Sequence, residues 1–174
     1  MESSLRYNGN PKSLSGASLK LYAKQKLPVD PNLFVQLHGE LDTRAGSPSY
    51  FAAIARYFEP KTGAKLGLGI QCFNQVRFRH GYTSRAKTAI PITEDRSLNL
   101  NIKGRCDIDS EFDQKKGRAA AELSWSMFNF TEDQDVRLKI GYEFIDKVPY
   151  LQIRENNWTV NADINGKWNV RFDL

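Results

Sequence analysis

The strongest constraint in this chain is a strict alternation of apolar and polar side chains over residues 97–108. Leu98, Leu100 and Ile102 belong to an apolar series, whereas Lys103 and Arg105 belong to a polar, net basic one. Successive side chains of a β-strand point to opposite sides, so this stretch predicts a strand with one apolar and one polar face. The same pattern recurs along most of the chain, and we therefore expect an all-β fold.

The alternating segments predict about twelve strands joined by short turns, with no significant helix. They cover residues 19–24, 33–42, 49–59, 64–73, 76–79, 86–92, 97–108, 117–129, 134–145, 149–154, 158–164 and 168–174. Asn165-Gly166 separates the last two and is typical of a tight hairpin turn. Residues 1–16 are rich in Ser, Asn and Gly and show little periodicity. We interpret them as an N-terminal lead, inside or beside the main fold, and residues 17–174 as one barrel domain.

A closed antiparallel barrel is the architecture that suits these strands. The last alternating run reaches Leu174, and an apolar strand left unpaired there would be a template for aggregation. Pairing of the last strand with the first removes that edge. No run approaches the ~18 uninterrupted apolar residues of a membrane-spanning helix. Spanning by strands stays open, because a lipid-facing strand shows only every second residue to the hydrocarbon.

The alternation alone leaves two barrels possible, one in lipid and one in water. In a water-soluble barrel the apolar faces would point inward, and its basic surface would bind an anionic ligand or single-stranded nucleic acid. A transmembrane barrel is favoured because the apolar faces of 97–108, 134–145 and 157–174 carry no charge. Several strands also exceed the usual length of about 5–6 residues. Trp158 and Trp168 lie near strand ends, where aromatic girdles of membrane barrels occur.

Charge indicates what such a barrel would carry. The chain has 25 Lys and Arg against 20 Asp and Glu, a net charge of +5, which points to anionic partners. If the polar faces line a lumen, sixteen cations and eight carboxylates point inward, and this excess would concentrate anions. The predicted lining cations are Lys20, Lys24, Lys26, Arg56, Lys65, Arg77, Arg79, Lys87, Lys103, Arg105, Arg118, Arg137, Lys139, Arg154, Lys167 and Arg171.

No enzymatic, metal or cofactor site is expected. His38 and Glu40 share one strand face, but such a pair arises by chance on any polar face. There is no GxxxxGK[ST] motif, and we interpret 67–69 (GLG) as a site of close packing or lumen clearance. Cys72 and Cys106 fall on apolar faces and are expected to be unpaired thiols. The N-terminal residues do not resemble a secretory signal, so the folded body would encode any membrane destination.

Several long segments of the sequence resemble the family of 21-kDa outer envelope pore proteins of plant chloroplasts. The likeness spans nearly the whole chain. The segments are 39–44 (GELDTR), 101–107 (NIKGRCD), 124–130 (SWSMFNF), 133–137 (DQDVR), 146–158 (DKVPYLQIRENNW) and 168–174 (WNVRFDL).

The resemblance implies a voltage-dependent, rectifying, anion-selective channel in the outer envelope of plastids, chloroplasts or etioplasts. It implies passage of phosphorylated metabolites such as triose phosphates and 3-phosphoglycerate, and of inorganic phosphate. It also implies that ATP binds within the pore as a regulator, and we expect ATP to compete with smaller anions for the same Lys and Arg side chains. Membrane lipid is then a partner and nucleic acid is not, while self-association stays open.

Overall fold

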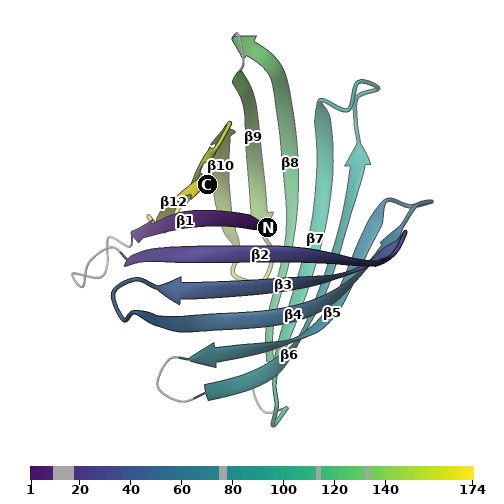
Figure 1. The fold of residues 1–174 in the computed structure, drawn as a ribbon. Helices are drawn as coiled ribbons and strands as arrows, with labels where there is room; N and C mark the ends of the chain where they lie inside the picture. The colour runs from purple at the N-terminus through teal and green to yellow at the C-terminus, as the bar shows by residue number, and fades with distance from the viewer. Residues whose placement is uncertain (10–17, 75–77, 113–114, 132–133) are drawn as a thin grey trace.

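The computed structural model describes residues 1–9, 18–74, 78–112, 115–131 and 134–174, which form one closed antiparallel β-barrel (Figure 1). This confirms the predicted fold class. Within the described ranges no helix is long and apolar enough to cross a membrane. The twelve strands are β1 (Glu2–Gly9), β2 (Ser18–Asp30), β3 (Leu33–Asp42), β4 (Ser47–Glu59), β5 (Ala64–Asn74), β6 (Phe78–Pro91), β7 (Leu98–Asp109), β8 (Lys115–Thr131), β9 (Gln134–Glu143), β10 (Val148–Glu155), β11 (Trp158–Asp163) and β12 (Trp168–Asp173).

The barrel closes where β1 meets β12. Each strand pairs antiparallel with its neighbours in the chain, and β1 lies between β12 and β2. Tyr7 stands opposite Val170 on one side and Leu19 on the other. In Figure 1 the purple first strand and the yellow last strand accordingly lie side by side. Closure lets the backbone groups of every strand pair within the sheet, which a membrane interior requires.

Two of the predicted strand boundaries are wrong, and their errors cancel in the total. Residues 2–9 of the predicted lead, whose place inside or beside the barrel the sequence leaves open, form its closing strand β1. The predicted strands 76–79 and 86–92 are not separate, because residues 78–91 form the single strand β6. Alternation fades along β6 because outward positions such as Ser84 and Thr88 are polar. The predicted lead residues 10–17 lie outside the described residues.

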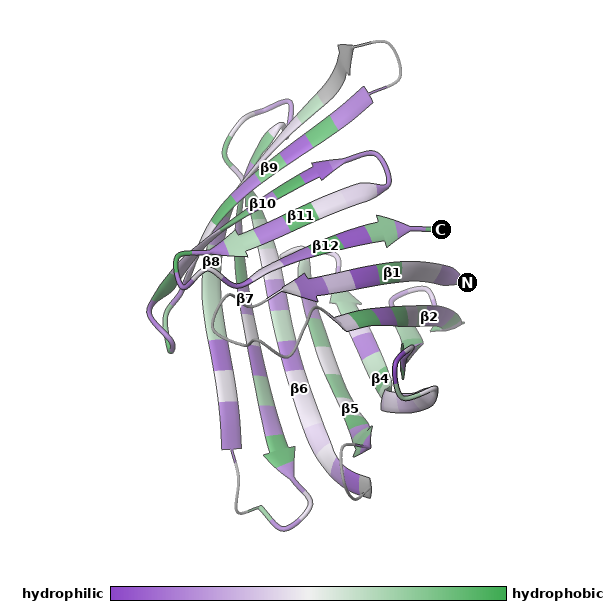
Figure 2. Ribbon diagram, turned by 90° about the vertical axis from the view of Figure 1, so that its left-hand side faces the viewer, coloured by the Kyte–Doolittle hydropathy of each residue, from purple (hydrophilic) through white to green (hydrophobic). Residues whose placement is uncertain are grey.

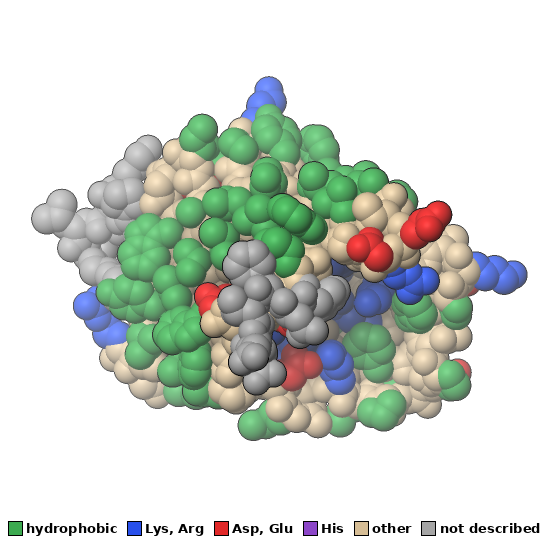
Figure 3. Space-filling view, turned by 90° about the horizontal axis from the view of Figure 1, so that it is seen from above, with side chains coloured by type: hydrophobic (Ala, Val, Ile, Leu, Met, Phe, Trp, Pro, Cys, Tyr) green, Lys and Arg blue, Asp and Glu red, His purple; other side chains and the backbone are tan. Residues whose placement is uncertain are grey.

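The apolar series of each strand faces outward. Leu68 and Ile140, from the apolar series, are 70 % and 57 % exposed. Gln71 and Glu122, from the polar series that alternates with it, are only 2 % and 4 % exposed. Figure 2 shows the resulting alternation of hydrophobic and hydrophilic bands along the strands, and Figure 3 shows apolar side chains on the outside with charged ones in the bore. An apolar exterior of this extent suits lipid and not water, so the water-soluble barrel is set aside.

The turns use the residues that their backbone requires. Gly166 in the β11–β12 turn has a φ of 77°, which a residue without Cβ adopts at no steric cost. Asn156 in the β10–β11 turn has a φ of 42°, and Asn tolerates this region better than most other residues. The Asn165-Gly166 hairpin predicted from the sequence is thereby confirmed. Cys72 and Cys106 are both free thiols, as expected.

The barrel wall is not of even height. β8 has 17 residues and β6 has 14, whereas β11 and β12 have six each and β1 and β10 have eight. In Figure 1 the β8–β9 hairpin extends well past the end of β10. The four short strands are neighbours around the barrel, so they form one low sector of the wall.

Candidate pore lining

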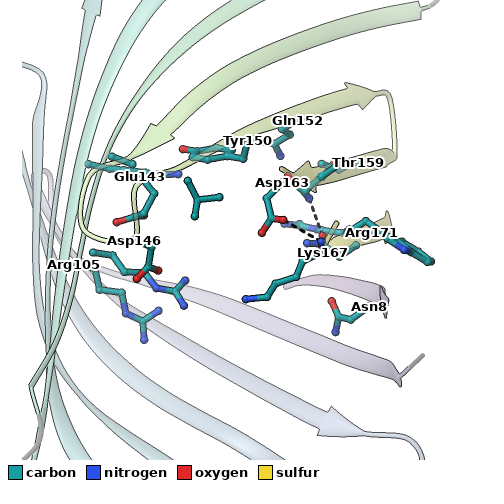
Figure 4. Close-up of a pocket in the computed structure, with 18 of the residues that line it drawn as sticks. Asn8, Arg105, Glu143, Asp146, Tyr150, Gln152, Thr159, Asp163, Lys167 and Arg171 are labelled. Atoms are coloured by element: carbon teal, nitrogen blue, oxygen red, sulfur yellow. Dashed lines mark hydrogen bonds between the residues drawn. The ribbon is translucent and has the colours of Figure 1, made fainter. Parts of the chain in front are cut away.

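The lumen contains a cavity of about 1170 Å³ with strongly cationic walls. Ten Lys and Arg side chains line it against three carboxylates, which are Glu143, Asp146 and Asp163. Figure 4 shows Arg105, Lys167 and Arg171 reaching into this space from different strands and from the β11–β12 turn. The cations are Arg6, Arg56, Lys65, Arg85, Lys87, Lys103, Arg105, Arg118, Lys167 and Arg171.

Strand register aligns four arginines in one row. Arg56 on β4 stands opposite Gly67 on β5, and Gly67 stands opposite Arg85 on β6. Arg85 stands opposite Arg105 on β7, which in turn stands opposite Arg118 on β8. Side chains directly opposite each other have Cβ atoms about 4.5–5.5 Å apart. We call Arg56, Arg85, Arg105 and Arg118 the arginine row.

A row of lysines lies directly beside it. Lys65 on β5 stands opposite Lys87 on β6, which stands opposite Lys103 on β7. Each of these lysines is two residues along its strand from the corresponding position of the arginine row, so it lies on the same face of the sheet. The two rows together place cations on five neighbouring strands.

A third group of cations crosses the point where the barrel closes. Arg137 on β9 stands opposite Arg154 on β10, and Arg6 on β1 stands between Arg171 on β12 and Lys20 on β2. Thr159 on β11 joins the two halves, since it is opposite both Arg154 and Arg171. The guanidinium carbon of Arg6 also lies 4.2 Å from the ring centre of Tyr22. Cations therefore line both sides of the bore.

Carboxylates neutralise only part of this charge. Lys20 contacts Glu40 at 2.5 Å, Lys103 contacts Glu122 at 2.5 Å, and Asp173 contacts both Arg154 and Arg171. Within the described ranges no ion pair is formed by Arg6, Arg56, Lys65, Arg85, Lys87, Arg118, Arg137 or Lys139. These side chains are the ones that a dissolved anion can neutralise.

The arginine row is held by a polar network on its lumen side. Arg85 Nη2 donates to the Tyr50 hydroxyl at 3.3 Å, and Arg105 Nη2 donates to Gln71 Oε1 at 3.1 Å. The Tyr50 hydroxyl itself donates to the same Gln71 oxygen at 3.3 Å. The Nε atoms of Arg56 and Arg85 are buried and have no hydrogen-bond partner among the described residues. Tyr50 thus holds Arg85 in place, while the Nε donors of Arg56 and Arg85 are unused.

Glycines let large side chains pack against the inner wall. A Cβ at Gly69 would collide with the Ala53 carbonyl oxygen, and one at Gly67 would meet Ile54 Cγ2 at 3.2 Å. Ile54 is fully buried above these two glycines. The interpretation of residues 67–69 as a close-packing site is confirmed.

The most buried carboxylate of the lumen anchors a second network. Glu122 Oε1 accepts from Lys103 Nζ at 2.5 Å and from the Tyr150 hydroxyl at 2.6 Å. The Tyr150 ring covers Gly141, where any Cβ would overlap the ring. Burial of Glu122 is therefore compensated by one ion pair and one neutral donor.

Eight of the sixteen predicted lining cations line the 1170 Å³ cavity, namely Arg56, Lys65, Lys87, Lys103, Arg105, Arg118, Lys167 and Arg171. Arg56, Arg105 and Arg118 fall in the arginine row, Lys65, Lys87 and Lys103 in the lysine row, and Lys20, Arg137, Arg154 and Arg171 at the closure. Lys139 lies two residues from Arg137 on β9, while Lys24 and Lys26 pair with Glu2. Arg79, opposite Phe73, is exposed near the start of β6. Arg77 lies outside the described residues.

Two cations that line the lumen were not predicted from the sequence. Arg85 was missed because polar outward neighbours hide the alternation in β6, and Arg6 because β1 shows only a short alternating run. Ser4, Arg6 and Asn8 do alternate with Leu5 and Tyr7, so the signal for β1 was present but brief.

His38 and Glu40 have structural environments. The imidazole of His38 packs between the rings of Tyr22 and Tyr50, with ring centres 5.8 and 5.4 Å away. The Glu40 carboxylate accepts hydrogen bonds from Lys20 and from Ser49. Ring packing holds His38, whose Nδ1 is buried without a hydrogen-bond partner among the described residues, and two side-chain donors hold the Glu40 carboxylate.

Comparison with known proteins places the chain in a family. The family described as "Chloroplast outer envelope pore protein OEP21" matches residues 3–174. The chain is 50 % identical to outer envelope pore protein 21 of Pisum sativum and 49 % identical to outer envelope pore protein 21A of Arabidopsis thaliana, in both cases over all of both chains. The corresponding Oryza sativa protein is 43 % identical, again over both full lengths.

A solved structure supports the fold independently. The KdgM porin matches with a TM-score of 0.57 at 9 % identity, covering 99 % of this chain and 96 % of that one. At this identity the likeness speaks for the porin-like barrel only. Together with the full-length sequence matches, it leads to one conclusion: the chain is a member of the OEP21 family of chloroplast outer envelope pore proteins, a β-barrel protein of that membrane and not an enzyme.

Proposed function

We propose that the pore is an anion-selective, voltage-dependent, rectifying channel for phosphorylated metabolites. Triose phosphates, 3-phosphoglycerate and inorganic phosphate are the proposed substrates, and ATP is proposed to bind in the lumen as a regulator. The observation that supports the proposal is the charge of the cavity, which ten cations and only three carboxylates line. Fixed cations beside a low-dielectric wall attract anions and exclude other cations.

Phosphate suits the arginine row for reasons of geometry as well as charge. A guanidinium presents several N–H donors in a fixed fork that matches phosphate oxygens. Arg56 and Arg85 lie on either side of Gly67 in the register, and Arg85, Arg105 and Arg118 follow on adjacent strands, so several guanidinium groups lie close together. ATP, with more negative charge than a triose phosphate, would compete for the same donors. Inhibition by ATP and passage of small phosphates then depend on one set of residues.

The test is a reversal-potential measurement in planar bilayers across a potassium chloride gradient. The variant Arg56→Gln/Arg85→Gln/Lys87→Gln removes three lumen charges that have no carboxylate partner among the described residues. We expect the reversal potential to move toward that of an unselective pore, and ATP to block less. Arg105→Gln/Arg137→Gln/Lys139→Gln should act in the same direction.

Lys61→Gln/Arg96→Gln/Lys147→Gln serves as the matched control, because it also removes three charges, from three exposed turns. Its reversal potential should equal that of the unmodified chain. If the lumen variant keeps both its reversal potential and its ATP block, the arginine and lysine rows do not determine selectivity and the proposal is wrong.

A further inference from the structure

The low sector of the wall is too short to cross a bilayer of ordinary thickness. A tilted membrane strand needs about 9–11 residues to span a hydrocarbon core of about 30 Å. β10, β11, β12 and β1 have eight, six, six and eight residues. Figure 2 shows these short strands beside the longer β8 and β9. Lipid next to this sector must adapt to a thinner apolar band.

Two tryptophans mark how thin that band is. Trp158 stands opposite Phe172 near one end of β11, and Trp168 stands opposite Ala162 near the other end. Only four residues of strand separate the levels of the two rings, which is about 14 Å at 3.4 Å per residue. Both rings are partly exposed on the outer face, and tryptophan prefers the membrane–water interface. The headgroup layer is therefore expected to approach the end of β11 that bears Trp158.

A cavity of about 670 Å³ lies at that end, at the rim of the wall, and residues of both sheet faces line it. Ser126, Arg137 and Arg154 line it from the lumen side, whereas Met127, Trp158 and Phe172 line it from the outer side. It forms where β9 runs past β10, since Val136 opposite Glu155 is the last pair between these strands. We call this cavity the notch.

The notch combines cations with aromatic surface. Arg137 donates from Nε to Ser126 Oγ at 3.0 Å and has no carboxylate partner among the described residues. Arg154 shares Asp173 with Arg171, and 45 % of its side chain is exposed. Trp158 and Phe172 pack with ring centres 4.7 Å apart on the lipid side. One carboxylate, Asp135, also lines the notch, against the two guanidinium groups.

We propose that the notch binds the phosphodiester headgroup of an anionic membrane phospholipid. Arg137 and Arg154 contact the phosphate, and the Trp158–Phe172 pair contacts the glycerol and the first acyl carbons. A soluble phosphate would lack partners for the aromatic pair, so the combination of surfaces favours a lipid. The site lies apart from the arginine row and does not depend on which anion the pore transports.

Tryptophan quenching tests this in the full-length chain. Trp125→Phe/Trp168→Phe leaves Trp158 as the sole tryptophan, and the protein is reconstituted in phosphatidylcholine vesicles. Brominated phosphatidylglycerol should quench Trp158 at about one-fifth of the concentration that brominated phosphatidylcholine requires, a fivefold preference. Arg137→Gln/Arg154→Gln in the same background should reduce this preference to about one.

Four comparisons can overturn the proposal. Arg85→Gln/Arg105→Gln removes the same charge elsewhere in the lumen and should keep the preference; an equal loss would assign it to the general potential of the pore. Arg137→Lys/Arg154→Lys keeps both charges and should also keep the preference for phosphatidylglycerol. A loss of the preference in this variant would mean that the substitutions disturb the fold and that charge is not the cause. Persistence in Arg137→Gln/Arg154→Gln, or displacement by millimolar glycerophosphate, would show that the notch is not a lipid site.

Discussion

Lys87 illustrates the conflict between stability and selectivity at the scale of single residues. It stands directly opposite Lys65 on one side and Lys103 on the other, and it has no ion pair among the described residues. Like charges directly opposite in a sheet are destabilising. Their retention on an inner wall is understandable if dissolved anions offset the repulsion. The stability of the barrel and its attraction for anions thus depend on the same side chains in opposite directions.

Lys87→Gln should accordingly stabilise the barrel while weakening its selectivity. We expect the free energy of unfolding to rise by about 0.5 kcal/mol, because two repulsive cross-strand pairs are removed. The anion-to-cation permeability ratio should fall. Urea unfolding in detergent micelles and bilayer reversal potentials measure the two quantities. Lys61→Gln, in an exposed turn, should change neither, and a Lys87→Gln protein that is less stable would contradict the argument.

Gly141 is a second residue with a sharp expectation. A Cβ there would overlap the Tyr150 ring, so Gly141→Ala displaces a side chain that donates to the buried Glu122 carboxylate. Overpacking and the loss of that hydrogen bond should lower the free energy of unfolding by about 2 kcal/mol. Gly104→Ala is the control, since nothing lies within 4 Å of its Cβ. Equal urea midpoints for the two variants would refute this reasoning.

Sequence reasoning placed individual cations well where flanking residues alternate cleanly. Lys139 lies between Leu138 and Ile140, so its face could be predicted. Arg85 lies between Ser84 and Ala86, so its face could not. The rows themselves were beyond prediction, because alternation fixes a residue's face but not which residue of the next strand stands opposite. Register depends on turn lengths and on bulges such as the one between Pro28 and Asp30.

At the scale of strands, closure is the feature that the sequence predicted only in part. The last strand was expected to pair with the first, and it does, but the first strand begins at Glu2. β1 was hard to recognise because it has only eight residues and its inward face is made of Glu, Ser, Arg and Asn. It belongs to the low sector, where every strand is short. Short strands show the weakest alternation, so the strand that the sequence did not reveal belongs to the low sector of the wall.

Removal of residues 1–9 should therefore prevent barrel formation. β12 and β2 would both lose their partner, which leaves two unpaired edges in lipid. We expect loss of the heat-resistant compact band in cold gel electrophoresis and loss of conductance. A chain with a polar extension before Met1 should retain both, since Met1 is exposed. A conducting pore without residues 1–9 would mean that β1 is not needed for closure.

The tight turns allow a paired test of backbone strain. Gly166→Ala places a Cβ at a φ of 77° and should lower the free energy of unfolding by about 1 kcal/mol. Lys147→Gly, at a φ of 54° in the exposed β9–β10 turn, relieves such strain and should be neutral or slightly stabilising. Urea unfolding of both variants checks the pair. The same loss in both would show that positive φ is not the cause.

At the scale of the whole molecule, three concentric layers account for the behaviour of the barrel. Aliphatic and aromatic side chains face lipid, paired backbone fills the wall, and cations line the bore (Figure 3). Because no dedicated filter is needed for charge selection, the summed field of many cations would distinguish anions from cations. Dissolved ions screen this field, so the distance over which it acts across the bore shortens as the salt concentration rises.

Anion selectivity should therefore decline as salt concentration rises. The Debye length is about 10 Å at 0.1 M and about 3 Å at 1 M, so high salt confines the field of each cation to the wall. We expect the anion-to-cation permeability ratio to fall steadily when reversal potentials are measured at equal concentration ratios but increasing mean concentration. Arg56→Gln/Arg85→Gln/Lys87→Gln should start from a lower ratio and depend less on salt. A ratio that does not change with salt would mean that selection rests on close contact with single residues and not on the summed charge of the lumen.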